Sequence, residues 1–179
     1  GLRFWEANSQ ALEAAQRSYG VPGEIIVAII GIETIYGRNA GKFPAFATLA
    51  TLAFDYPPRA ELFRSELEAL LLLARESRRS PIVYSGSYAG ALGIPQFLPS
   101  SIRNWGVDFD GDGQVDLAAS TLDAIGSVAN FLASHGWETG SPIAAPASVT
   151  GDRFVELINA GILPRFLPEA MTAYGVSPA

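Results

Sequence analysis

The sequence predicts a mainly α-helical globular protein, and three observations support this class. Of its 179 residues, 49% are hydrophobic and 17% charged, a composition typical of a chain that buries a core. Apolar residues recur at helical spacing in several segments bounded by glycine or proline. The alternating pattern of a half-buried strand does not extend over any useful length. We expect one domain over 1–179, less regular from 139 to 179, where loops precede short helices.

The first two helices are separated by a short glycine- and proline-containing turn. Residues 3–19 favour a helix, with Gly20 as its stop. The second helix is expected over residues 22–37, because Pro22 suits the first helical position and Gly37 suits the C-terminal end. Apolar residues occur on every side of this second helix between 25 and 35, so it is expected to be buried all round.

Glu33 is the exception in this apolar helix. A carboxylate is rarely buried without a partner, so it must pair with a cation, be held protonated, or open into a cleft. The structural interpretation is an ion pair with Arg38. The functional interpretation is a general acid whose pKa is raised by the apolar surround, which includes Ile29, Ile30 and Ile32.

The remaining helices follow from the same periodicity. The clearest amphipathic one covers 60–78, and we interpret its charged residues as a solvated face: Glu61, Arg64, Glu66, Glu68, Arg75, Glu76, Arg78 and Arg79. Residues 84–97 hold three glycines and a proline among apolar side chains, which indicates a closely packed segment. Shorter helices are expected at 47–54, 99–105, 121–135, 152–160 and 165–174.

Composition excludes several classes of function. The net charge of −6 argues against nucleic acid or an anionic membrane surface as the partner. Without cysteine there are no disulfides, thiol nucleophiles or cysteine-ligated zinc. The one histidine, His135, falls at the expected C-terminal end of a helix, where a positive charge suits the helix dipole. We therefore favour a structural role for His135 over a role as catalytic base.

An acidic loop at 108–116 matches the start of an EF-hand calcium loop. Ala119 stands where a bidentate glutamate is usual, and Asp123 is the candidate for the closing carboxylate. The alternative is a solvated acidic turn, but three spaced aspartates without a cation repel one another. We therefore favour a structural Ca²⁺ and expect no organic cofactor. The expected ligands are Asp108, Asp110, Asp112, Gln114 (through its backbone carbonyl) and Asp123.

Taken in order along the chain, four motifs and the acidic loop resemble one family. The motifs lie at 31–39, 56–60, 86–97 and 123–130. Together they closely resemble the B-type lytic murein transglycosylases of bacteria, a branch of the lysozyme-like superfamily. The resemblance extends from about residue 3 to about residue 140 and implies a lysozyme-like helical domain with an EF-hand-like calcium loop.

The resemblance also implies a site. In the family, the glutamate at the position of Glu33 is the sole catalytic acid and base. It cleaves the β-1,4 bond between N-acetylmuramic acid and N-acetylglucosamine and leaves a 1,6-anhydro end. The implied substrate-binding residues are Arg59, Ser87, Gln96 and Phe131, with Tyr88 and Phe97 as further candidates.

The implied substrate-binding residues could also have purely structural roles. Ser87 and Gln96 can satisfy backbone groups of the tight segment, and Arg59 can cap a helix or pair with Asp55. Tyr88 and Phe97 fit the core as well as a sugar-stacking surface.

The resemblance implies that the protein is a monomer in the bacterial periplasm. Its implied partner is the glycan strand of peptidoglycan. Other cell-wall enzymes as partners, and outer-membrane association through a segment outside this sequence, are compatible with it. Two other functions stay open from the residues alone. The same scaffold can hydrolyse the bond as a lysozyme does, or it can bind peptidoglycan without catalysis.

Overall fold

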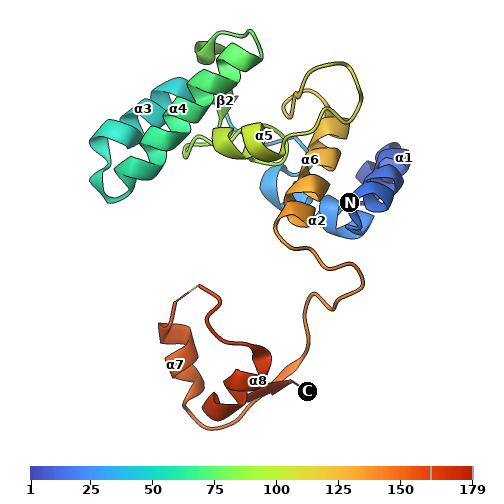
Figure 1. Cartoon of the computed structure of the whole chain (residues 1–179), viewed down its shortest axis with the longest axis vertical. Helices are drawn as coiled ribbons and strands as arrows, with labels where there is room; N and C mark the ends of the chain where they lie inside the picture. Colours follow the sequence, from blue (N-terminus) through green and yellow to red (C-terminus); the bar gives the residue numbers. More distant parts are fainter. Residues whose placement is uncertain (162, 179) are drawn as a thin grey trace. The chain divides into compact units, whose positions relative to one another are not determined.

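The chain folds as two compact units, Gly1–Thr139 and Gly140–Ala179. The structure, a computed structural model, describes residues 1–161 and 163–178 (Figure 1). Helices dominate, as the sequence predicts. The single domain expected over 1–179 is divided at the point where the sequence becomes rich in glycine and proline, because such a stretch offers few apolar side chains to pack against a core.

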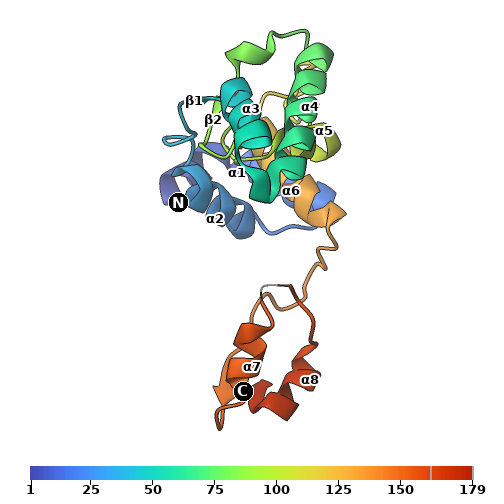
Figure 2. The same cartoon turned by 90° about the vertical axis from the view of Figure 1, so that its left-hand side faces the viewer.

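The first unit is a helical domain with one very short antiparallel ladder. Helices α3 and α4 lie side by side as a hairpin, while α6 packs against α1, α2 and α5 (Figures 1 and 2). Its elements are α1 (Leu2–Tyr19), α2 (Gly23–Thr34), β1 (Phe43–Pro44), α3 (Ala45–Asp55), α4 (Ala60–Glu76), β2 (Ser85–Gly86), α5 (Pro99–Trp105) and α6 (Thr121–Ser134). Strand β1 pairs with β2. Each helix expected from the sequence in this unit is present, with its ends shifted by a few residues at most.

Helix α6 lies at the centre of this unit. Every residue of its segment 123–129 is buried, including the polar Asp123 and Ser127. The largest apolar side chains of the core come from the surrounding helices, and they include Leu12, Ile26, Ile30, Leu49 and Leu70. Because burial of such side chains is the main stabilising contribution to folding, the position of α6 is strongly determined.

Helix α2 differs from the expectation in length and in burial. It ends at Thr34 rather than Gly37, and the two residues that follow, Ile35 and Tyr36, have left-handed φ values of 53° and 62°. Only one side of the helix faces the core, and Ile32 is 82% exposed. The prediction of all-round burial is wrong because the last turn of α2 emerges at the surface of the unit.

The chain reversal after α2 is fixed by close packing and by one buried hydroxyl. Tyr36 folds back so closely that a Cβ atom on Gly31 would lie 2.6 Å from the Tyr36 hydroxyl oxygen, so a larger residue there would displace the Tyr36 ring. The Thr34 Oγ1 donates to the Ile94 carbonyl over 2.7 Å and accepts from the Gly37 amide over 2.9 Å. These bonds join the end of α2 to the tight segment at 93–97.

Glu66 on α4 is buried, which corrects its assignment to a solvated face. It is 4% exposed, and its carboxylate accepts hydrogen bonds from the Ser100 amide (3.0 Å) and the Ser100 hydroxyl (2.6 Å). The first turn of a helix leaves backbone amides without partners inside the helix. Glu66 therefore caps α5 from a different helix and holds it against α4.

Replacing Glu66 by alanine is expected to destabilise the first unit by about 2 kcal/mol, because a buried donor loses its charged acceptor. The free energy of unfolding can be measured in urea by tryptophan fluorescence, since Trp5, Trp105 and Trp137 all lie in this unit. The matched control is Glu68→Ala, an exposed glutamate on the same helix. Equal changes in the two variants would contradict the capping role.

The second unit is small and open. Strand β3 (Ala147–Val149) pairs antiparallel with β4 (Val176–Pro178), next to α7 (Phe154–Asn159) and α8 (Pro168–Met171). Arg153 contacts the Tyr174 ring and pairs with Glu156 over 2.8 Å, and the bonds from Arg153 lower the pKa of Glu156. None of its described residues is buried. Within residues 1–161 and 163–178, no helix has the length and apolar character needed to span a membrane.

Candidate active site

A groove of about 290 Å³ opens beside the C-terminal end of α2. Four segments form its walls: α2, the stretch 95–98, the start of α5, and the middle of α6. The lining residues are Ile29, Glu33, Pro95, Gln96, Phe97, Leu98, Ser101, Val128, Phe131 and Leu132. The groove therefore brings together residues from both ends of this unit's sequence, from Ile29 to Leu132, and most of its surface is apolar.

Glu33 is exposed and lies on the wall of this groove. Among the described residues it takes part in no ion pair, so the expected alternative of a pair with Arg38 is wrong. The apolar surround expected for it is only partial, because Ile29 lines the groove whereas Ile32 points away into solvent. Of the three possibilities for this carboxylate, the opening into a cleft is the one observed.

Gln96 is held beside Glu33 in a strained backbone conformation. Its φ is 53°, and its side-chain Nε2 donates to the carbonyls of Ala40 (3.0 Å) and Gly93 (2.9 Å). A non-glycine residue at positive φ persists only where its surroundings hold it there. The amide group is thus fixed on the groove wall, and its carbonyl oxygen is left to accept a hydrogen bond from a ligand.

Phe97 and Phe131 form the aromatic wall of the groove. Their ring centroids are 5.3 Å apart, and the Phe131 ring also meets Trp105 edge-on at 5.1 Å. Phe97 is buried and Phe131 half-buried, so Phe97 serves as packing for the more accessible ring.

Three predicted substrate-binding residues do not line this groove. The Ser87 hydroxyl accepts from the amides of Ala89 (3.3 Å) and Ala91 (3.1 Å), as the structural alternative predicts. Arg59 is exposed with its guanidinium 5.6 Å from the centroid of the Phe63 ring, and Tyr88 is exposed at a turn. Their contacts with substrate stay predictions.

Sequence reasoning missed several groove residues, among them Ser101 and Leu132. Ser101 follows the Ser100 that Glu66 caps, so its position depends on a contact between α4 and α5. Leu132 follows Phe131 on α6. A helical pattern shows that such residues share an element, but it does not show which other element they face.

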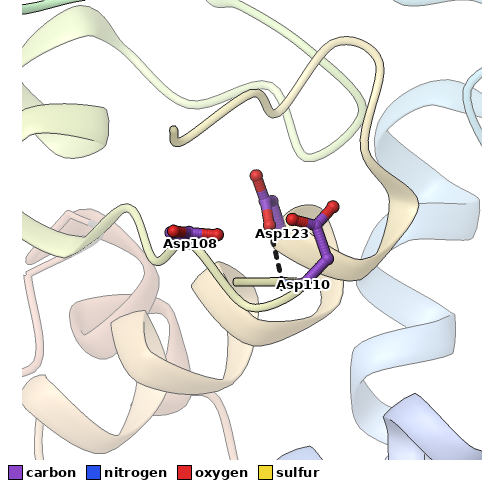
Figure 3. A group of neighbouring side chains, drawn as sticks. All are labelled: Asp108, Asp110 and Asp123. Carbon is purple, nitrogen blue, oxygen red and sulfur yellow. Dashed lines mark hydrogen bonds between the residues drawn. The ribbon is translucent and has the colours of Figure 1, made fainter. Parts of the chain in front are cut away.

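The acidic loop at 108–116 is tied to α6 by one buried carboxylate (Figure 3). Asp123 is 1% exposed and accepts from the backbone amides of Phe109 (2.8 Å), Asp110 (3.3 Å) and Asp116 (2.8 Å). The Phe109 ring packs so tightly on α6 that a Cβ atom on Gly126 would lie 2.5 Å from it. The loop therefore has its shape imposed by contacts with α6.

The donors of this loop fit a hard cation. One carboxylate oxygen from each of Asp108, Asp110 and Asp123 can be chosen so that all lie within 4.8 Å of one another. Calcium takes oxygen ligands at about 2.3–2.6 Å, so oxygens on opposite sides of the ion are up to about 5 Å apart. Asp112 lies outside this group and accepts from the Gln114 amide over 2.8 Å. Ligation by Asp112 and by the Gln114 carbonyl stays a prediction.

Asp116 closes the loop on its other side. Burial alone would raise the pKa of Asp116, but hydrogen bonds from Arg79 (2.9 Å) and from the amides of Ala118 and Ala119 outweigh it and lower that pKa. Asp116 is therefore held as a carboxylate by an ion pair with Arg79, whereas Asp108, Asp110 and Asp123 have no cationic side chain as a partner among the described residues.

Among the described residues, Glu33 is the one carboxylate on the wall of an apolar groove, and the acidic loop packs on the central helix of the same domain; this arrangement agrees with the lysozyme-like fold that the sequence predicts. The chain belongs to the transglycosylase SLT domain family, which matches it over residues 1–179. Membrane-bound lytic murein transglycosylase B of Escherichia coli strain K12 is 50% identical over 148 residues, which cover 83% of this chain and 41% of that protein.

Solved structures agree with this assignment. The soluble lytic transglycosylase SltB1 from Pseudomonas aeruginosa is 46% identical, with a TM-score of 0.89 over 98% of this chain and 59% of that one. E. coli Slt35 in complex with calcium is 44% identical, with a TM-score of 0.82 over 98% and 55% of the two chains. SltB3 from P. aeruginosa in complex with NAG-anhNAM-pentapeptide is 30% identical, with a TM-score of 0.81 over 99% and 46%. The chain thus spans less than two thirds of these relatives.

Proposed function

We propose that this chain carries the catalytic site of a lytic transglycosylase. It cleaves the β-1,4 bond between N-acetylmuramic acid and N-acetylglucosamine in peptidoglycan, and Glu33 is both the acid and the base. The observation that carries the proposal is that Glu33, exposed and unpaired, is the only acid among the described residues that line the groove. Glycosidases of the common type have two carboxylates, and the second lies on the other side of the scissile glycosidic bond.

In the first step, the protonated Glu33 carboxyl gives its proton to the glycosidic oxygen. The bond from C1 of the muramyl residue to that oxygen breaks, and N-acetylglucosamine leaves with a free 4-hydroxyl. The 2-acetamido oxygen of the muramyl residue shares the positive charge that develops at C1, as in substrate-assisted glycosidases.

In the second step, the Glu33 carboxylate takes the proton from the 6-hydroxyl of the same muramyl residue. The 6-oxygen attacks C1 and closes the 1,6-anhydro ring, while Glu33 returns to its protonated state. No water is consumed, so one group that is first acid and then base is sufficient. The NAG-anhNAM-pentapeptide bound by SltB3 supports an anhydro product in this family.

Gln96 and the aromatic wall position the glycan in this scheme. The fixed amide of Gln96 offers its carbonyl oxygen to the acetamido N–H or to a hydroxyl of the sugar. Phe131 offers an apolar surface to the flat side of a sugar ring. Arg59, Ser87 and Tyr88 belong to outer contacts, with Arg59 meeting carboxylates of the lactyl or peptide groups.

We further propose that Asp108, Asp110 and Asp123 hold a structural Ca²⁺, with Asp112 and the Gln114 carbonyl as further ligands. The spacing of the three carboxylates supports this, as does the calcium complex of Slt35. The ion neutralises the clustered charge of the loop and takes no part in the reaction.

The proposed partner is the peptidoglycan glycan strand, encountered in the periplasm. The similarity to an E. coli relative that is named as membrane-bound supports work at the cell envelope. The net charge of −6 disfavours nucleic acid as an alternative partner.

The mass of the products tests the reaction. Digestion of purified sacculi by the chain is expected to release muropeptides that end in 1,6-anhydro-N-acetylmuramic acid, each lighter by one water than the product of a lysozyme. Hydrolysed ends would show lysozyme-type hydrolysis instead. No release would favour a non-catalytic binding module. Heat-denatured protein is the control for spontaneous release.

A further inference from the structure

The aromatic wall of the groove continues beyond Phe131. The imidazole of His135 stacks on the Phe131 ring with centroids 4.0 Å apart and an interplanar angle of 28°. The Trp105 indole meets both rings, at 5.1 Å from Phe131 and 4.5 Å from His135. His135 is exposed and Trp105 half-buried, so this cluster of rings extends from the groove residue Phe131 to solvent.

This surface follows the direction of two neighbouring helices. Ser101 and Trp105 are four residues apart on α5, and Phe131 of α6 is four residues before His135, which caps the C-terminal end of that helix. Residues at this spacing lie on the same side of a helix, about 6 Å apart along its axis. The Asn130 side chain donates to the Trp105 carbonyl over 3.0 Å and fixes the two helices together. One residue of each pair lines the groove, and the other lies one turn further on.

The His135 ring is held in one orientation. Its Nδ1 lies 2.6 Å from the Phe131 carbonyl, and because a carbonyl only accepts, Nδ1 carries the proton in this bond. In the neutral tautomer that this bond selects, Nε2 can accept a hydrogen bond from a ligand. An apolar ring surface with a polar atom at its edge matches a sugar ring, which presents C–H groups on its face and hydroxyls around its rim.

We propose that Trp105 and His135 form a further glycan-binding subsite, which accepts the next sugar ring of a peptidoglycan strand beyond the one that contacts Phe131. The occupant is the glycan strand, because Phe131 belongs both to the groove that holds Glu33 and to this ring cluster. This subsite rests on the proposed function, since that function supplies a strand long enough to reach it.

Affinities measured for glycans of increasing length test the subsite in the absence of catalysis. Calorimetric titration of the Glu33→Gln protein with peptidoglycan glycans, from disaccharide to octasaccharide, gives the dissociation constant at each length. The affinity is expected to rise by a step at the length that reaches Trp105 and His135. In His135→Ala or Trp105→Leu this step is expected to shrink by roughly threefold to tenfold, while shorter glycans bind unchanged.

Two further variants separate stacking from structural damage. His135→Phe keeps the stacked ring and is expected to restore most of the step. Phe54→Ala removes an aromatic residue of α3 that is 68% exposed and outside the groove, and it should leave every dissociation constant unchanged.

Equal loss at all lengths, or no loss at any length, would overturn the subsite. Neither outcome bears on the reaction, because the anhydro product is measured separately. Conversely, a failure to form anhydro ends leaves the binding step intact.

Discussion

Glu33→Gln is expected to abolish the release of anhydro muropeptides from sacculi, with a fall in rate of about a thousandfold or more. A single general acid or base commonly contributes about 10²- to 10⁴-fold, and Glu33 serves in both steps. Glutamine has nearly the same shape and still accepts a hydrogen bond, but it has no proton to give to the glycosidic oxygen. Because Glu33 is exposed and makes no ion pair with any residue that the structure describes, the substitution should leave stability nearly unchanged.

The control for this variant is Glu24→Gln, the same substitution at an exposed site in the first turn of α2. The Glu24→Gln variant should retain full activity. For both variants, mass spectrometry of the soluble fragments measures the activity, and a thermal melt measures the melting temperature. If Glu33→Gln and the unaltered chain release the same amount of muropeptide, Glu33 is not the acid and the enzymatic function fails with it.

Removal of calcium by a chelator is expected to lower the melting temperature of the first unit by about 5–10 °C. An ion present at about 100 times its dissociation constant stabilises the folded state by about 2.7 kcal/mol, and each kcal/mol shifts the midpoint by about 2–4 °C in a chain of this size. Restoring Ca²⁺ should restore the original midpoint. An unchanged midpoint would contradict calcium binding.

Two variants of the loop should separate the ion from the hydrogen bonds. Asp110→Asn removes one charge of the cluster and is expected to abolish most of the calcium-dependent shift. Asp123→Ala is expected to cost about 3 kcal/mol even with chelator present, because three backbone amides lose their buried acceptor. The control is Asp55→Asn, an exposed aspartate of the same unit, which should keep the full shift.

The helices could be predicted because their signals are local. The extent of α1 and its stop at Gly20 follow from periodicity and from the left-handed φ of 71° that glycine adopts easily. The acidic loop was recognisable for the same reason, since its donors lie within a few residues of one another. Glu33 is a carboxylate in an otherwise apolar helix, and this pattern predicts a partner or an open cleft beside it.

Burial of individual side chains was predicted less well. The composition of α2 predicts a helix enclosed on all sides, yet Ile32 is exposed because the last turn faces the open groove and solvent. Glu66 shares the charged pattern of α4, yet it is buried because Ser100 of α5 offers it two donors. Both differences depend on which element packs nearby, and periodicity carries no information about that.

The helical class, the acidic loop, and Glu33 as the group of interest could all be predicted from the sequence, because each rests on residues close together in the chain. The folded structure adds that Glu33 stands at an open groove with no ion-pair partner among the described residues, that Gln96 and Phe131 share this groove, and that Asp123 holds the loop. These features depend on contacts between α2, α5 and α6, which lie far apart in sequence and set the solvation and the partners of each side chain.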